Sequence, residues 1–200
     1  LASAKIVPRP PEGVRTSAWL ERVEQHPIGT GPYRVVSFGE TLLLEASGDS
    51  LLLLQGDRRT ALVPQGDDAF LGPAPAFALF PLRFERDSTG VTGVVYGGRW
   101  YIGERYHGPR VFHYPPAWNG YVGHYRIMQP WEPNFRIILR RGTLVWVGPE
   151  GDEEPLTPLA GGEFRVGEPL SAERLSFDAV VDGQALRASF SGMTYYRFFT

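Results

Sequence analysis

Cysteine is absent from the 200-residue sequence, and lysine occurs once, as Lys5, among twenty basic residues. Without cysteine the chain has neither a disulfide framework nor a zinc–thiolate site, and the absence leaves the cellular compartment open. A serine nucleophile of the Ser-x-x-Lys kind needs a lysine three residues after the serine, and Ala2 stands three residues before Lys5. That motif is therefore excluded, and the Gly-Lys phosphate loop and the Gly-x-Ser-x-Gly elbow are missing as well.

Long apolar runs and a surplus of one charge are also missing. The longest apolar candidates are Leu42–Leu44 and Leu51–Leu54, far below the ~20 residues that a helix needs to span a bilayer. The formal net charge is −2, which gives no general attraction to polyanions. We therefore expect a soluble protein with no membrane span and no nucleic-acid partner.

The first 27 residues are predicted to be a linker followed by a short helix. The opening "LASAKIVPRPPEG" has neither the charged start nor the long apolar stretch of a signal peptide, and it reads equally as a linker or as a disordered natural terminus. Ser17 can cap a helix that Pro27 stops. Its apolar stripe consists of Trp19, Leu20 and Val23, so one side is expected to pack against a sheet.

The rest of the chain is typical of an all-β protein. Its 24 glycines and 18 prolines separate short runs rich in Val, Leu, Phe and Tyr, which is the pattern of many short strands joined by turns.

The two halves of the chain resemble each other. Gly31 and Tyr33-Arg34 match Gly123 and Tyr125-Arg126 at an offset of 92 residues. Further along, the matches are Leu82-x-Phe84 with Leu175-x-Phe177, Gly90 with Gly183, and Tyr101 with Tyr195. The small drift in offset fits short insertions in turns, so we infer a tandem duplication.

Each half is predicted to form eight strands and to close as an up-and-down antiparallel barrel, because closure removes the exposed edges of an open sheet. The first barrel is assigned to residues 28–106 and the second to 121–200. The strands are expected near 31–37, 40–47, 50–55, 58–64, 69–71, 76–86, 91–96 and 99–105, and near 122–128, 134–140, 143–148, 153–159, 163–166, 173–181, 184–190 and 193–199. The run Leu51–Leu54 breaks the alternation of apolar and polar residues and predicts a strand buried on both faces.

The linker between the barrels, residues 107–120, is rich in proline and aromatic residues rather than in Gly and Ser. Tyr106, Phe112, Tyr114 and Trp118 are therefore expected to pin it to one or both barrels.

Candidate chemical groups are few. His107 and His113 lie on one side of an extended segment, within reach of a metal together with Glu104, but ordinary linker histidines are the favoured interpretation. Carboxylates paired beside glycine, at 67–68 and 152–154, are interpreted as solvated turn charges. No catalytic residue, cofactor or metal is expected.

The two Tyr-Arg pairs allow two interpretations. Adjacent residues of a strand face opposite sides, so Tyr33 and Tyr125 either fill the barrels with Arg34 and Arg126 outside, or the reverse. Inward arginines would suit an anionic ligand. The favoured interpretation places tyrosine in the core.

The second half also resembles a known family. The resemblance covers residues 115–199 and rests on "GHYR" at 123–126, "PNFR" at 133–136, "FRVG" at 164–167 and "DGQALR" at 182–187; the first half matches more loosely. These residues are similar to the C-terminal, lipocalin-like region of bacterial serine hydrolases of the β-lactamase and penicillin-binding-protein-like superfamily, which includes esterases and D-aminopeptidases. The catalytic motifs of such enzymes lie upstream of this region and have no counterpart here.

The resemblance implies a pair of lipocalin-like barrels that form a non-catalytic accessory module. Such a module packs on the catalytic serine-hydrolase domain upstream in the same chain, and shapes substrate access or assembly, including homo-oligomers, in the bacterial cytoplasm, the periplasm or outside the cell. Contacts are expected at the linker aromatics and at the hairpin that carries Trp131 and Phe135, because exposed loop aromatics mark interfaces. The alternative is a lipocalin-like binding module for a small apolar or amphipathic ligand. An independent hydrolase is a third, weaker interpretation.

Overall fold

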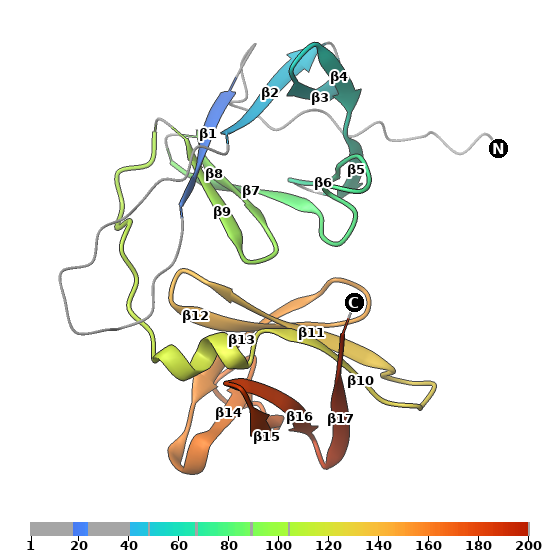
Figure 1. The fold of residues 1–200 in the computed structure, drawn as a ribbon. Coiled ribbons are helices and arrows are strands. Elements are labelled where there is room, and N and C mark those ends of the chain that lie inside the picture. Colours follow the sequence, from blue (N-terminus) through green and yellow to red (C-terminus); the bar gives the residue numbers. More distant parts are fainter. Residues whose placement is uncertain are drawn as a thin grey trace. The chain divides into compact units, whose positions relative to one another are not determined.

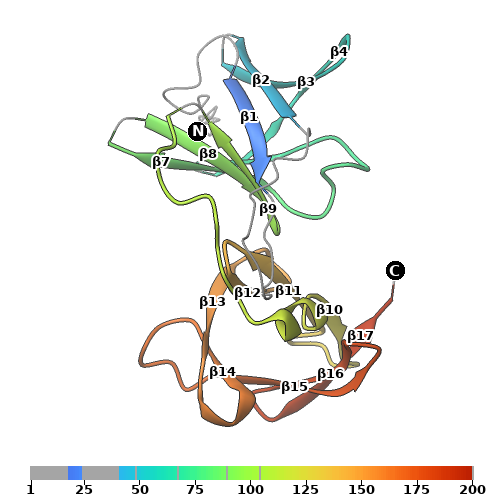
Figure 2. The ribbon, with the colours of Figure 1, turned by 60° about the vertical axis from the view of Figure 1, so that its left-hand side comes forward.

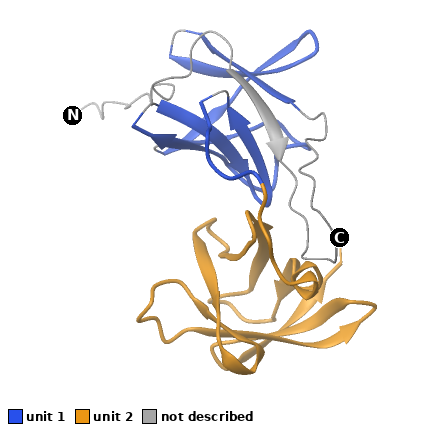
Figure 3. Cartoon of the chain, turned by 90° about the vertical axis from the view of Figure 1, so that its left-hand side faces the viewer, with its two compact units in different colours: residues 1–24, 34–110 blue, residues 25–33, 111–200 orange. Residues whose placement is uncertain are grey.

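The computed structural model describes residues 18–23, 41–47, 49–66, 68–88, 90–103 and 105–199, with backbone only at 18–23. The chain divides into two compact units, residues 1–24 with 34–110 and residues 25–33 with 111–200 (Figure 3). Apart from two short 3-10 helices, the regular structure of the described residues is β-strand (Figure 1). The all-β prediction is therefore confirmed.

The first unit contains an open nine-stranded antiparallel sheet. Its strands are β1 Ala18–Val23, β2 Thr41–Ser47, β3 Ser50–Gln55, β4 Arg58–Ala61, β5 Val63–Gly66, β6 Ala69–Leu71, β7 Leu82–Asp87, β8 Gly90–Tyr96 and β9 Arg99–Gly103. The spatial order is β4-β3-β2-β1-β9-β8-β7-β6-β5. The strands predicted at 50–55 and 69–71 have the observed bounds, whereas 76–81 precedes β7 and is a turn region.

The helix predicted before Pro27 is wrong, because Ala18–Val23 forms strand β1. This segment pairs with β2 on one side and with β9 on the other. Two ladders of backbone hydrogen bonds outweigh the weak helix preference of six residues, which are too few for a stable isolated helix.

The first closed barrel is also wrong, and the comparison with the second unit shows why. In that unit a single strand, β13 Glu153–Pro158, pairs with one neighbour through its first half and with the next through its second half. Its counterpart in the first unit is divided at Leu62 into β4, which pairs with β3, and β5, which pairs with β6. Pro64, which has no N–H to donate, and a register shift before Gly66 accompany the division. The ladder therefore ends at β4 and β5.

Alternating side chains form the core of the first sheet. Leu51 and Leu53 are buried while Leu52 and Leu54 are half-buried, so β3 is not the strand buried on both faces that the leucine run predicts. That property belongs to β8, where Val91 through Tyr96 are all buried. The core of this unit also contains Leu42, Leu44, Phe70, Phe77, Leu82, Phe84 and Tyr101.

The second unit is a closed eight-stranded antiparallel barrel (Figure 2). Its strands are β10 Gly123–Arg126, β11 Asn134–Arg140, β12 Thr143–Val147, β13, β14 Glu163–Val166, β15 Arg174–Val181, β16 Gln184–Phe190 and β17 Met193–Phe198, with 3-10 helices η1 Pro116–Gly120 and η2 Ala160–Gly162. The last strand, β17, pairs with the first, β10, which closes the barrel. The predicted barrel of the second half is confirmed, and three of its strands have the predicted bounds.

The strand orders of the two units are similar, but the strand between β2 and β9 is β1 Ala18–Val23 and not the segment 31–37 that the sequence repeat aligns with β10. Leu82 in β7 and Leu175 in β15 are both fully buried, as are Tyr101 in β9 and Tyr195 in β17. β1 lies between β2 and β9 just as β10 lies between β11 and β17. The strand predicted at 31–37, with Arg34, lies outside the described residues.

Candidate interaction surface

The barrel interior is filled by side chains. Tyr125, Phe135, Trp146, Phe190 and Tyr195 are buried and contact one another at ring-centre distances of 4.8 to 6.4 Å. The other buried residues of this core are Ile137, Leu144, Leu156, Phe164, Val166, Leu175 and Ala188. Aromatic rings at these distances are in van der Waals contact, so these side chains pack together as a core inside the barrel.

One end of the barrel is closed by η1 and by Arg197 from β17. The guanidinium donates hydrogen bonds to the carbonyls of Ala185 (2.6 Å), Val122 (2.8 Å) and Gly120. It also donates to the Tyr125 hydroxyl at 3.0 Å, and that hydroxyl donates to the Tyr121 carbonyl at 2.8 Å. Burial raises the pKa of Tyr125 to about 12, against the opposing effect of the Arg197 charge.

The opposite end carries the loop between β10 and β11, residues 127–133. Its backbone is closed by a hydrogen bond from the Ile127 N–H to the Pro133 carbonyl at 2.9 Å. The Gln129 side chain donates to the Glu132 carbonyl at 2.7 Å, and the Tyr195 hydroxyl, from inside the barrel, donates to the same carbonyl at 3.2 Å. These bonds, together with two prolines in the loop, hold its conformation.

This loop displays two large apolar side chains to solvent. Trp131 is 89% exposed and Met128 is 102% exposed. An exposed tryptophan on an ordered loop is uncommon, because Trp is mostly buried and is enriched at the energetic centres of interfaces. Trp131 is therefore exposed to solvent, and its predicted role in interface contacts stays a prediction.

Phe135, predicted with it, is a different case. It stacks on Tyr125 at 5.4 Å and is buried in the barrel core. The prediction that Phe135 makes interface contacts is wrong, because the strand begins at Asn134 and Phe135 takes the first inward position of β11.

The outer wall beside this loop carries an aromatic and cationic strip, formed by His124, Arg126, Tyr196 and Phe198. Arg126 lies 4.6 Å from the centre of the Phe198 ring, and His124 packs edge-on against the same ring. Arg126 therefore points outward while Tyr125 points inward, as the favoured interpretation of the Tyr-Arg pair predicts. Desolvation lowers the pKa of His124, and the charges of Arg136 and Arg126 lower it further, against a hydrogen bond to Asn134.

The linker aromatics are held within their own units. Tyr114 is buried and donates to Asn119, and Trp118 packs edge-on against Phe164 at the η1 end. Phe112 lies against Gly142. Tyr106 packs edge-on against Trp100 at 4.8 Å and donates to the Pro109 carbonyl. These residues attach the linker, as predicted, and their side chains serve packing within each unit.

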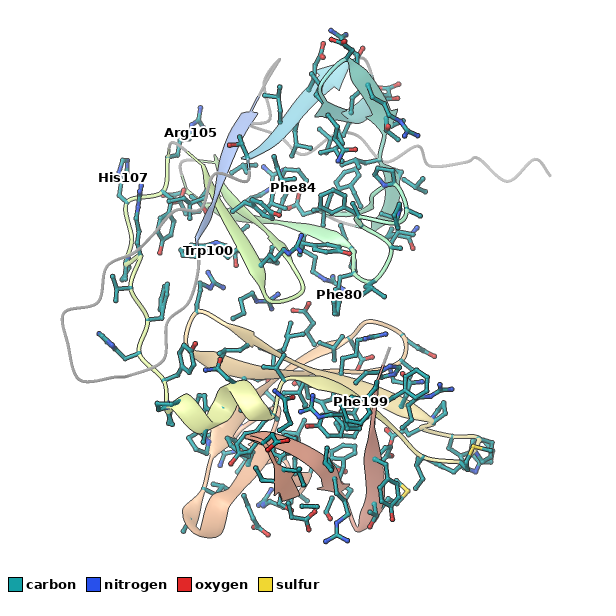
Figure 4. All side chains as sticks on the ribbon, viewed as in Figure 1. Phe80, Phe84, Trp100, Arg105, His107 and Phe199 are labelled. Carbon is teal, nitrogen blue, oxygen red and sulfur yellow. The ribbon has the colours of Figure 1, made fainter. Side chains whose placement is uncertain are left out.

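A pocket of about 660 Å³ lies in the first unit, lined by Asp87, Thr92, Arg105, Tyr106, His107 and Gly108. Arg105 and His107 follow β9 (Figure 4). The lining of the pocket contains charged side chains of both signs, Asp87 and Arg105. Of the residues considered for a metal site, His107 belongs to the first unit, His113 belongs to the second, and Glu104 lies outside the described residues. Among the residues described, no group of three or more His, Cys, Asp or Glu could hold a metal ion.

The sequence did not single out Met128, Arg197, or the two residues that β17 contributes to the aromatic and cationic strip, Tyr196 and Phe198. The exposure of Met128 could have been predicted from the sequence, because it lies in the same proline-containing loop as Trp131. The outward direction of Tyr196 and the inward direction of Arg197 depend on the register of β17 with β10.

The chain matches no protein-family model, no curated protein and no solved structure. None of the helices formed by the described residues has the length and apolar character needed to cross a membrane.

Proposed function

We propose that this chain is a non-catalytic accessory module that docks on a catalytic domain through the exposed loop at one end of its closed barrel. The observation that carries the proposal is Trp131, 89% exposed on a loop whose conformation is held by internal hydrogen bonds. A preorganised loop loses little entropy on binding, which is the property of a docking element.

The family resemblance supports a scaffold role. Its residues lie at positions that define the barrel: Tyr125, Phe135, Phe164 and Val166 are core side chains. Asp182 and Gly183 form the turn between β15 and β16, both with positive φ. The residues that carry the resemblance therefore have a structural role in the barrel. The partner that the resemblance implies is the catalytic domain of a serine hydrolase of the β-lactamase-like superfamily, encoded upstream in the same chain.

The alternative of a lipocalin-like module for a small apolar ligand receives less support. In the second unit aromatic side chains pack together inside the barrel, and the lining of the pocket in the first unit includes the charged side chains of Asp87 and Arg105. Apolar ligands require an apolar cavity of several hundred Å³.

The test is to measure hydrolysis of an ester, amide and β-lactam panel by residues 1–200 alone, by the protein segment encoded upstream, and by both together. We expect no turnover by the chain alone and a changed rate or substrate range after recombination. Turnover by the isolated chain that a point mutation abolishes, or no effect of the chain on the upstream segment, would contradict the proposal.

A further inference from the structure

The loops of the closed barrel fall into two sets. Because successive strands run in opposite directions, the connections 127–133, 148–152, 167–173 and 191–192 all lie at one end, which we call the loop end. The other end carries η1, η2 and the short turns at 141–142 and 182–183. In Figure 1 the loop between β10 and β11 projects from the barrel at the end away from η1.

Three apolar side chains project from the loop end. Leu170, in the loop between β14 and β15, is 99% exposed and joins Met128 and Trp131. Met128 and Trp131 are carried by one loop, and Leu170 is carried by a loop four strands further around the closed barrel, so large apolar side chains are exposed on both sides of this end.

The loop between β14 and β15, residues 167–173, is also ordered by its own hydrogen bonds. The Ser171 N–H donates to the Glu168 carbonyl at 2.9 Å, and the Glu173 N–H donates to the Ser171 hydroxyl at 3.2 Å. Arg174 donates to the Ser171 carbonyl at 2.9 Å. Leu170 is therefore displayed from a fixed turn, as Trp131 is.

The charged residues within the four loops of this end have one sign. Its four loops contain five carboxylates, Glu132, Glu150, Asp152, Glu168 and Glu173, and no lysine or arginine. Arg126 and Arg174 lie at the same end, as the last residue of β10 and the first of β15, so the five loop carboxylates outnumber these two arginines. A concentration of negative charge around apolar tips favours a partner of opposite charge and disfavours others.

Building on the proposed docking role, we infer that the partner of the loop end is a protein surface with an apolar groove bordered by lysine and arginine side chains. Trp131 and Leu170 enter the groove, and the five carboxylates face its basic border. The apolar tips supply most of the affinity, and the charges steer association and set the orientation. A membrane surface is disfavoured, because anionic headgroups would repel the carboxylates.

The test measures binding of residues 1–200 to the protein segment encoded upstream, by calorimetry at low and high salt. Two variants address the two parts of the inference: Trp131→Ala removes an apolar tip, and the triple variant Glu150→Lys, Glu168→Lys and Glu173→Lys reverses the charge. Leu79→Ala, an exposed leucine of the first unit, and Glu163→Lys, at the other end of the barrel, are the matched controls.

We expect Trp131→Ala to weaken binding by about tenfold or more, as at interface hot spots. Charge reversal should weaken binding at low salt by about tenfold, through slower association, and remove most of the salt dependence of the affinity. The controls should bind like the wild type.

Other outcomes overturn the inference in distinguishable ways. Wild-type binding that neither variant weakens leaves the docking role standing and removes the loop end as its site. Absence of any binding removes the docking role and the inference together. Binding to vesicles of phosphatidylcholine with phosphatidylserine, or Trp131-dependent self-association in sedimentation, would identify a membrane or a second copy as the occupant instead.

Discussion

Arg197 and Tyr125 are joined in two ways: the guanidinium donates to the hydroxyl at 3.0 Å and lies 5.2 Å from the centre of the ring. Arg197 belongs to the last strand and Tyr125 to the first, and the remaining guanidinium bonds reach carbonyls at the end of η1 and on β16. The pair therefore ties the seam of the barrel to the helix that covers its end. A charged hydrogen bond in a buried setting is stronger than a neutral one and costly to leave unmade.

Tyr125 should make stability fall at high pH. Its pKa is raised from about 10 in the unfolded chain to about 12, so its contribution is complete below pH 10 and is lost as the pH rises through 12. The expected loss is about 2 to 3 kcal/mol between these pH values. Urea unfolding followed by circular dichroism at pH 8 to 12 measures it.

Tyr125→Phe is the matched variant for this prediction. It should cost about 1 to 3 kcal/mol at pH 8, because the Arg197 and Tyr121 groups lose a partner, and it should flatten the alkaline slope. Burial also raises the pKa values of Tyr114 and Tyr195, so a smaller fall in stability with rising pH should remain in the variant. An unchanged slope in the variant would show that the buried hydroxyl does not govern alkaline unfolding.

Gly120→Ala should destabilise the barrel strongly. A Cβ atom at this position would lie 1.9 Å from the Gly183 carbonyl oxygen, which is backbone and cannot turn aside. We expect a loss of about 3 kcal/mol or more in the free energy of unfolding. Gly151→Ala is the control: its φ of +88° strains an alanine, but nothing lies within 4 Å, so a loss of about 1 kcal/mol is expected. Equal losses would mean that η1 does not approach the β15–β16 turn this closely.

Strand positions in the second unit were predictable because turn residues mark nearly every boundary. Arg141-Gly142 and Asp182-Gly183 adopt positive φ between strands whose ends they define, and β11, β14 and β16 have the predicted bounds. Glycine, asparagine and aspartate are favoured in such turns, so their positions in the sequence indicate where strands end.

The predictions that were wrong concern features decided by pairing between strands that are far apart in the sequence. Trp19, Leu20 and Val23 have a spacing compatible with a helix, and only β2 and β9 make the segment a strand. The division at Leu62 follows from how β4 and β5 pair with different neighbours, which no local pattern records. Likewise, Phe135 and Trp131 are both loop-proximal aromatics in the sequence, and the register of β11 separates the buried one from the exposed one.

Truncation to alanine should change the free energy of unfolding very little at Trp131 and strongly at Trp146. Trp131→Ala removes an exposed side chain and should change the free energy of unfolding by no more than about 0.5 kcal/mol. Trp146→Ala removes a core ring that packs between Phe135 and Phe190 and should cost about 3 to 5 kcal/mol. Urea denaturation of both variants tests the contrast. A large loss for Trp131→Ala would assign the loop a structural role and weaken its assignment as a docking element.

Residues 111–200 should fold alone. Every strand of the barrel pairs with neighbours within this range, β17 closes on β10, and both barrel ends are covered by segments of the same range. A closed sheet leaves no edge that needs another unit for its hydrogen bonds. We expect dispersed amide resonances in NMR spectra and a single cooperative urea transition with a free energy of unfolding of about 5 kcal/mol, typical of a domain of this size. The fragment with Arg197→Ala is the control and should unfold at lower urea. A fragment that binds hydrophobic dyes and shows collapsed NMR spectra would mean that the barrel requires residues outside this range, although its hydrogen-bonded ladders do not.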